Sequence, residues 1–279
     1  MSAGILNQWR NTEMAFEYQE TTQDLKTRID IHQRYGSRNI DEWMLQVIEP
    51  SEGARILDVG CGSGKQLNAF HEHLDGKAQI TGGDVNPSLL VEARARNAEL
   101  GNPWKLVALD FDKPFELASG SYDLVTCCFA LYYARDFRFT VGELHRVLVP
   151  GGRLFTTGPL PGNKRLFYEL IQEATGKPIP PMPGSSRYGT EILEAIRGKF
   201  PSVEVTLFEN PLEFESIEPF LDYTRASLSE DRKLWKSLFE SGAGFEQVMQ
   251  QIEQAGRRRL RQEGRLVMTK LVGGFLAAK

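Results

Sequence analysis

Apolar segments of strand length alternate with amphipathic segments of helical length between about residues 55 and 157. In chain order, the pattern predicts strand 55–59, helix 65–74, strand 79–84, helix 87–100, strands 105–109 and 122–129, helix 139–148 and strand 153–157. This alternation is typical of an α/β domain in which helices cover both faces of a mostly parallel sheet. Such sheets bind ligands beyond the carboxyl ends of their strands.

Two further regions flank this alternation. Residues 13 to about 50 repeat apolar side chains at helical spacing until Pro50, and they predict helices. After the alternating region we predict a turn at 150–152 that enters strand 153–157, and a second turn at 159–163. A loop follows from 178 to about 188. The remaining predicted elements are helix 191–200, strand 203–209, helices over 217–262 with a break near 242–244, and strand 266–277. Gly273 and Gly274 in the last strand indicate a bulge or a close backbone approach.

The first strand runs directly into a glycine-rich turn with the sequence Gly60-Cys61-Gly62-Ser63-Gly64. Glycine has no Cβ, so the backbone bends sharply there and a ligand can approach it closely. Asp84 ends the next strand, at the spacing at which a carboxylate grips the ribose hydroxyls of a nucleoside. The turn and the carboxylate together predict a nucleoside-binding site.

Two familiar phosphate-binding patterns do not fit. The dinucleotide pattern G-x-G-x-x-G requires a third glycine where this chain has Lys65, which disfavours a nicotinamide dehydrogenase. The P-loop pattern fails because Val59 stands in place of its first glycine and Gln66 in place of its Ser or Thr.

The stretch D-V-G-C-G-S-G at 58–64 resembles the first motif of class I S-adenosylmethionine (SAM)-dependent methyltransferases, in particular the small-molecule group similar to quinone-biosynthesis methyltransferases. The resemblance continues through Asp84, 109–111, 122–126 and 143–154. It implies a Rossmann-like, seven-stranded, mostly parallel sheet that two terminal strands complete, one of them antiparallel. It also implies SAM as the cofactor and S-adenosylhomocysteine as its product.

The same resemblance assigns cofactor contacts. The glycines bend around the amino-acid part of SAM, Asp58 anchors its amino group indirectly, Asp84 binds the ribose, and Asp110 and Phe111 meet the adenine. The full expected set is Asp58, Gly60, Cys61, Gly62, Gly64, Asp84, Val85, Asp110, Phe111, Cys128 and Phe129.

We expect residues 1–50 to form an N-terminal helical cap, and residues 51–279 to form the SAM-binding domain with a substrate lid inserted at about 160–262. Candidate substrate contacts are Tyr18, Arg28, Tyr35 and Tyr133. Because in-line methyl transfer works largely by alignment, no fixed catalytic group is implied; His32, Tyr132 and Tyr133 are the candidates. A surface pair of Arg28 with His32, and ordinary packing of Tyr132 and Tyr133, are the alternatives.

The composition and charge of the chain limit the kinds of partner that we expect. A net charge of −4 gives no overall attraction to nucleic acid, and the basic run 257–261 is diluted by Glu253 and Glu263. Cys61, Cys127 and Cys128 lack metal-ligand spacing, and we expect no metal. No apolar run is long enough to cross a membrane, so we expect a cytoplasmic protein. The resemblance implies methyl transfer to a small organic molecule. A macromolecular methyltransferase, or a protein of this fold that binds SAM without transferring methyl, is the alternative.

Overall fold

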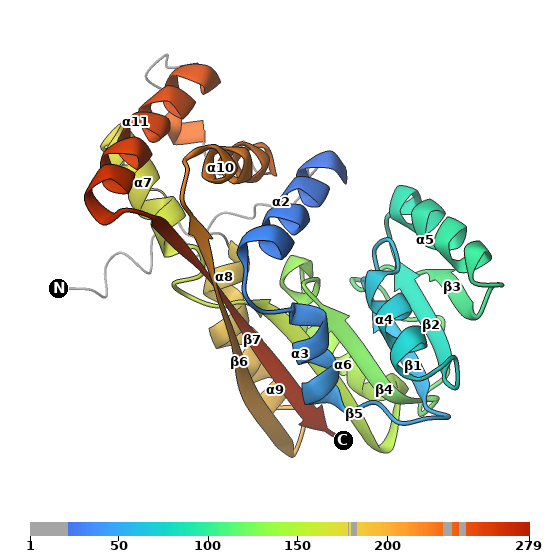
Figure 1. Ribbon diagram of the computed structural model, residues 1–279. Coiled ribbons are helices and arrows are strands. Elements are labelled where there is room, and N and C mark those ends of the chain that lie inside the picture. Colours follow the sequence, from blue (N-terminus) through green and yellow to red (C-terminus); the bar gives the residue numbers. More distant parts are fainter. Residues whose placement is uncertain (1–21, 178, 180–182, 231–235, 240–243) are drawn as a thin grey trace.

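A computed structural model describes residues 22–177, 179, 183–230, 236–239 and 244–279 of the chain. These residues form one sheet of seven strands in the order β3-β2-β1-β4-β5-β7-β6 (Figure 1). The strands are β1 (Arg55–Val59), β2 (Gln79–Asp84), β3 (Trp104–Ala108), β4 (Tyr122–Cys128), β5 (Leu148–Pro159), β6 (Ser202–Phe214) and β7 (Leu266–Ala278). Strands β1 to β5 are parallel, and β7 is antiparallel to both of its neighbours, β5 and β6. The predicted fold class is confirmed.

Helices cover both faces of the sheet and also gather beyond one of its ends. They are α2 (Thr22–Tyr35), α3 (Ile40–Ile48), α4 (Lys65–His73), α5 (Pro87–Glu99), α6 (Phe137–Val147), α7 (Arg165–Thr175), α8 (Pro183–Arg187), α9 (Leu193–Arg197), α10 (Glu218–Glu230) and α11 (Phe245–Glu263). Short 3₁₀ turns lie at Leu131–Tyr133 and Lys236–Leu238, and a π-helical turn at Tyr188–Ile192. Within the described residues no helix is long and apolar enough to cross a membrane.

The buried apolar side chains form three clusters. One joins α6 and α9 to one face of the sheet, and another joins α3, α4 and α5 to the opposite face. Cys127 belongs to the first cluster and Cys128 packs against the second, so the two adjacent cysteines point to opposite faces, as the strand pattern predicts. The third cluster packs α2, α7, α10 and α11 around the ends of β6 and β7 that project beyond the sheet (Figure 1).

A buried asparagine ties α2 and α3 to the edge of the sheet. The Asn210 side chain of β6 accepts hydrogen bonds from the backbone N–H groups of Ser37 (2.9 Å) and Arg38 (3.2 Å), and it donates to the Arg38 carbonyl (3.1 Å). From residue 22 onward, the predicted N-terminal helical region therefore consists of two helices, broken at residues 36–39 where Asn210 holds the connection. The part of the prediction that concerns residues 13–21 lies outside the described residues.

Two local predictions are wrong. The turn at 150–152 is part of β5, whose pairing with β4 shifts register between Tyr122 and Leu124. The segment 183–188, predicted as loop, is the helix α8 with the start of the π-helical turn, because Tyr188 is buried there. Its ring stacks on Phe275 at 4.5 Å, and its hydroxyl lies 2.7 Å from the Thr156 hydroxyl. Tertiary packing thus organises a segment whose local sequence favours a loop.

Gly273 and Gly274 in β7 mark a close approach rather than a bulge, since the pairing with both neighbouring strands is continuous. A Cβ on Gly274 would lie 2.7 Å from the Trp43 ring of α3 and 2.8 Å from the Thr206 hydroxyl. The indole has little freedom to move, because it packs between Phe155 and Phe208. The missing side chain therefore makes the space in which α3 docks on the sheet.

We expect Gly274→Ala to lower the free energy of unfolding by about 1–3 kcal/mol, because the added methyl overpacks the Trp43 site. Gly142→Ala is the matched control: Gly142 lies within α6 with open space where a Cβ would stand, and alanine there stabilises by about 0.5–1 kcal/mol. Urea unfolding of both variants measures the difference. Equal stabilities would contradict the packing assigned to Gly274.

Candidate active site

The glycine turn after β1 is fastened to the second strand by backbone hydrogen bonds. The N–H groups of Gly60 and Cys61 both donate to the Gly83 carbonyl, at 2.8 and 3.0 Å. Gly60, Gly62 and Gly64 have φ of 77°, 53° and 80°, in the left-handed region that favours glycine. A Cβ on Gly60 would lie 2.5 Å from the Ala130 methyl, whereas a Cβ on Gly62 would meet nothing within 4 Å. The turn is therefore packed on one side and open at Gly62.

Asp84 joins this turn to the end of β2. One carboxylate oxygen accepts the Gly62 N–H at 2.8 Å, and the other accepts the Asn86 N–H, also at 2.8 Å. The side chain is buried beside Val85, which is 61% exposed. A carboxylate oxygen has two lone pairs, so each oxygen keeps one for a ligand. The structure brings together the two features from which the sequence predicts a nucleoside site.

Asp58 lies beneath the turn and is only 2% exposed. Its carboxyl accepts a 2.6 Å hydrogen bond from the Thr126 hydroxyl of β4. Burial is the main cause that raises the pKa of Asp58 from 3.8 to about 7, with the Thr126 hydrogen bond opposing the rise and nearby Asp84 contributing to it. The group can thus exchange a proton near neutral pH.

Asp110 and Phe111 follow β3 at the same edge. Asp110 accepts from Lys113 Nζ at 3.0 Å and from the Asp112 N–H at 3.0 Å. Burial raises the pKa of Asp110, but these hydrogen bonds outweigh it and hold the pKa below its ordinary value. The Phe111 ring packs partly buried against the core, and its carbonyl accepts from the Thr140 hydroxyl at 3.1 Å.

Cys128 and Phe129 end β4 at the sheet's carboxyl edge. Burial raises the pKa of the Cys128 thiol well above its ordinary value, so it stays protonated. Phe129 has a φ of 55°, unusual for a bulky side chain, and its N–H donates to the Thr157 carbonyl at 2.9 Å. This conformation places the Lys270 ammonium 5.2 Å from the centre of the Phe129 ring.

Sequence reasoning missed one polar group in this site. Gln66 lies in the first turn of α4, directly after the glycine turn, and its side-chain Nε2 is buried without a hydrogen-bond partner. Its neighbour Lys65 pairs with Asp41 of α3 at 2.7 Å. The position of Gln66 could have revealed it from the sequence, because the start of a helix that follows a glycine turn presents hydrogen-bond donors to a ligand.

The candidate substrate and catalytic residues are spread more widely. Tyr132 and Tyr133 pack on each other at 4.6 Å, and Tyr132 also contacts Tyr188. Tyr35 packs on Phe214 at 5.2 Å, away from the glycine turn among the helices of the third cluster. Arg28 is half-buried on α2 beside His32. Tyr18 lies outside the described residues.

His32 is held between α2 and α10. Its ring meets the Tyr223 ring edge-on at 5.5 Å, and its Nδ1 is buried without a hydrogen-bond partner. Burial lowers the pKa of His32 well below 6.5, and Lys270, Lys164, Arg28 and Lys65 lower it further. The imidazole is therefore neutral. In burial and in charge it differs from what an exposed surface pair with Arg28 would require.

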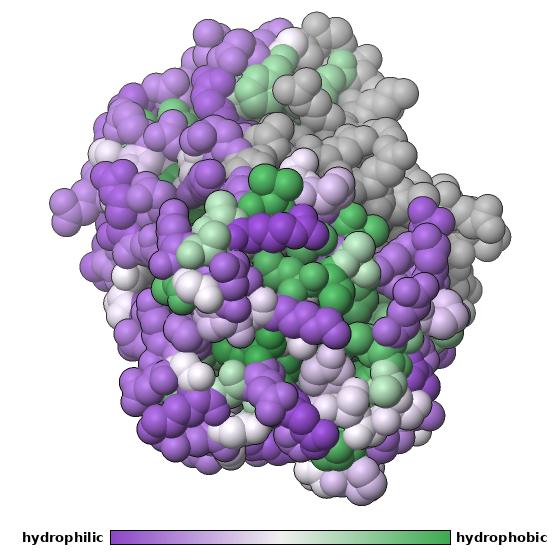
Figure 2. Space-filling view, turned by 90° about the vertical axis from the view of Figure 1, so that its right-hand side faces the viewer, coloured by the Kyte–Doolittle hydropathy of each residue, from purple (hydrophilic) through white to green (hydrophobic). Residues whose placement is uncertain are grey.

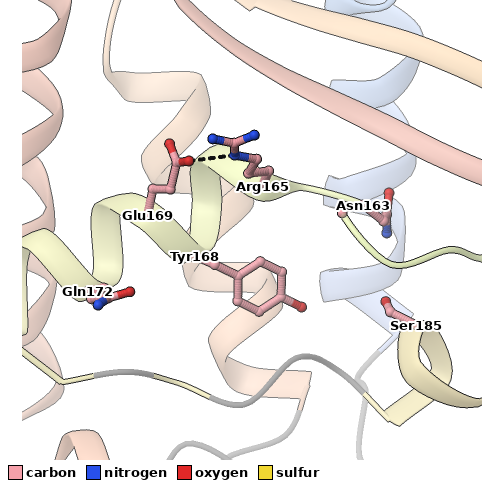
Figure 3. A pocket seen from close by; sticks show the side chains of 7 residues that line it. Asn163, Arg165, Tyr168, Glu169, Gln172 and Ser185 are labelled. Carbon is pink, nitrogen blue, oxygen red and sulfur yellow. Dashed lines mark hydrogen bonds and ion pairs between the residues drawn. The ribbon is translucent and has the colours of Figure 1, made fainter. Parts of the chain in front are cut away.

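A separate hollow of about 310 Å³ lies beside α7, lined by Gly162, Asn163, Arg165, Tyr168, Glu169, Gln172 and Ser185 (Figure 3). Arg165 and Glu169 at its rim pair with each other at 2.6 Å. None of the residues predicted from the sequence lines it. The glycine turn and Asp84, with their directed hydrogen bonds, remain the better-founded ligand site.

Comparison with known proteins finds relatives in sequence and in fold. Residues 56–152 match the model of a methyltransferase domain family. The demethylmenaquinone methyltransferase of Thermus thermophilus is 32% identical over 54% of this chain and 69% of its own length. The ubiquinone/menaquinone biosynthesis C-methyltransferase of Desulfotalea psychrophila is 29% identical over 64% of this chain and 66% of its own. The chain thus spans just under two thirds of the Desulfotalea relative. 

The fold is also found among solved structures. The YcgJ protein of Bacillus subtilis superposes with a TM-score of 0.57 at 17% identity, over 86% of this chain and 97% of that one. At this identity the likeness shows the shared fold alone.

The raised pKa of Asp58 predicts a stability that depends on pH. Because the folded state holds this proton more tightly than the unfolded state, stability falls as pH rises from about 4 to about 7 and levels off above. Asp58→Asn has no proton to lose. We expect its stability relative to the wild type to grow by up to about 4 kcal/mol between pH 4 and pH 8 in urea unfolding. A difference that stays constant with pH would contradict the assignment.

Proposed function

Because the chain belongs to the class I SAM-dependent methyltransferases, we propose that it binds SAM at the glycine turn and transfers the methyl group to a small organic molecule. The observation that carries the proposal is the Asp84 carboxylate, which is bonded to the Gly62 N–H and keeps a free lone pair on each oxygen. S-adenosylhomocysteine is the product that leaves.

The residues present fit this cofactor. The open side of Gly62 admits a ligand to the backbone, and Asp84 offers paired acceptors to two ribose hydroxyls. Asp110 and Phe111 offer an acceptor and a flat apolar face to an adenine, while Asp58 lies under the turn to support the amino group. The unpartnered Nε2 of Gln66 would donate to a carboxylate oxygen. We propose that Val85, Cys61, Cys128 and Phe129 complete the lining.

Bound SAM supplies a methyl group that is already activated on a sulfonium. The chain's own task is then to hold the acceptor in line and to exclude water, and alignment of this kind contributes on the order of 7–11 kcal/mol to a reaction. Neutral His32 and the hydroxyls of Tyr132 and Tyr133 are our candidates for orienting the acceptor or receiving a proton.

A helical lid would exclude water from the site. We propose that α2 acts together with α7, α10 and α11, with which it shares the third apolar cluster, and that these helices cap the carboxyl edge of the sheet. On the face turned toward the viewer in Figure 2, apolar side chains gather in the middle with hydrophilic ones around them. An apolar surface of this kind suits an organic acceptor.

The basic run on α11 supports a small-molecule acceptor over a nucleic acid. Arg257 pairs with Glu218 and Glu253, Arg258 pairs with Glu173, and Arg259 contacts three glutamates, Glu169, Glu173 and Glu263. Charges that are matched in this way leave little for phosphates. The quinone-biosynthesis relatives, by their names, also point to small organic acceptors.

The direct test is transfer of label. Incubation with methyl-labelled SAM and a metabolite extract should move label into a small product, and heat-inactivated protein provides the background. Binding of SAM without any labelled product would instead favour a SAM-binding protein that catalyses no methyl transfer.

We expect Asp84→Asn to weaken SAM binding by about 1–3 kcal/mol in calorimetry, because a charge-assisted hydrogen bond to the ribose is lost while an oxygen remains for the Gly62 N–H. Asp222→Ala, an exposed aspartate on α10, is the control and should bind like the wild type. Wild-type affinity in Asp84→Asn would refute the ribose assignment.

A further inference from the structure

Two lysines from different elements converge on the carboxyl edge of the sheet. Lys164 follows the turn after β5, and Lys270 lies in β7; their backbones are neighbours, since the Lys164 N–H donates to the Thr269 carbonyl at 2.9 Å. The Lys270 ammonium lies over the Phe129 ring at 5.2 Å, and the Lys164 ammonium lies over the Tyr223 ring at 5.1 Å. Both charges therefore sit between the end of β4 and the helix α10.

Within the described part of the chain, this place carries an excess of positive charge. Burial, together with the charges of Lys164, Lys65 and Arg28, lowers the pKa of Lys270 to about 7, and Asp41 opposes this shift. Asp41 is already engaged by Lys65 at 2.7 Å. Among the described residues no carboxylate lies within ion-pair distance of Lys164 or Lys270. Cations gathered in this way repel one another unless an anion joins them.

Several polar atoms on the neighbouring helices α2 and α10 are buried without hydrogen-bond partners among the described residues. Besides Nδ1 of His32, the hydroxyls of Tyr223 and Ser227 are buried without hydrogen bonds. Tyr223 and Ser227 lie one turn apart on α10, and the Tyr223 ring contacts both His32 and the Lys164 ammonium. Leaving such groups unsatisfied costs about 1–3 kcal/mol each, so a ligand with oxygen acceptors is the simplest completion.

We propose that the methyl acceptor is a small organic anion, held through its negatively charged oxygens by Lys270 and Lys164 with the hydroxyl groups of Tyr223 and Ser227. This inference rests on the proposed function, because it takes the space beside Phe129 as the acceptor's place. The cofactor does not remove the need for an anion. Its carboxylate is balanced by its own ammonium, and its sulfonium adds one more positive charge.

The test uses protein loaded with S-adenosylhomocysteine and a matched pair of probes, benzoate and neutral benzamide. We expect benzoate to bind at least about tenfold more tightly than benzamide by ligand-observed NMR. Lys270→Met and Lys164→Met should each weaken benzoate about 10- to 100-fold, which is the usual loss for a hydrogen bond to a charged group. Inorganic phosphate, as a third probe, distinguishes a phosphorylated acceptor from a carboxylic acid.

Lys105→Met, an exposed lysine on β3, is the control and should leave benzoate binding unchanged. Lys270→Arg keeps the charge and should retain most of the binding, which separates loss of charge from loss of folding. Equal binding of benzoate and benzamide would overturn the proposal. So would a loss of S-adenosylhomocysteine binding in folded Lys270→Met, because the lysine would then serve the cofactor. Wild-type protein that fails to bind S-adenosylhomocysteine at all would refute the proposed function instead.

Proton uptake gives a second readout. Lys270 faces Lys164, Lys65, Arg28 and His32 as well as Asp41, and a bound anion would offset the cations and favour its charged form. Benzoate binding at pH 8 should therefore take up a fraction of a proton, measured by calorimetry in buffers of different ionisation enthalpy. Lys270→Met should abolish most of this uptake. Benzoate binding without proton uptake in the wild type would contradict the placement of the anion at Lys270.

Discussion

The bond between the Asp84 carboxylate and the Gly62 N–H is the constraint on which the site depends. The glycine turn leaves β1 and the carboxylate ends β2, so their meeting fixes two neighbouring strands at one edge. The pairing is reinforced where Gly60 and Cys61 donate to Gly83. A carboxylate that is already oriented by backbone donors needs no rearrangement to receive a ligand, and such preorganisation is what binding sites gain from rigid elements.

The proposed acceptor site comes from the other end of the strand order, at β7 and β6. β6 and β7 run well past their neighbours and carry the helices of the third cluster beyond the sheet (Figure 1). Because β7 is antiparallel to β5, its passage back along the sheet brings Lys270 beside the end of β4. Asn210 on β6 then holds the link between α2 and α3, so that Arg28 and His32 are presented to the same space.

The sequence predicted the sheet, and the meeting of the glycine turn with Asp84, because their signals are local. Strand periodicity, the glycines at 60–64 and the spacing to Asp84 each reflect backbone needs that few other residues meet. The segment around Tyr188 was mispredicted because its helix depends on stacking against Phe275, far along the chain. The lysine pair could not be predicted for the same reason: Lys164 and Lys270 lie in separate elements, and only the antiparallel strand makes them neighbours. Gln66 could have been predicted from the sequence, since it directly follows the glycine turn.

Because the apolar side chains form three separate clusters, substitutions in one part of the molecule need not disturb another. The groups around the proposed acceptor stand largely on α2, α10 and the outer part of β7, whose packing is centred on the third cluster, whereas the glycine turn rests on the two clusters that sandwich the sheet. Replacements in parts that share few neighbours alter free energy almost independently. Selection can therefore alter the proposed acceptor site through substitutions in the outer helices, while the proposed nucleoside site at the glycine turn stays unchanged.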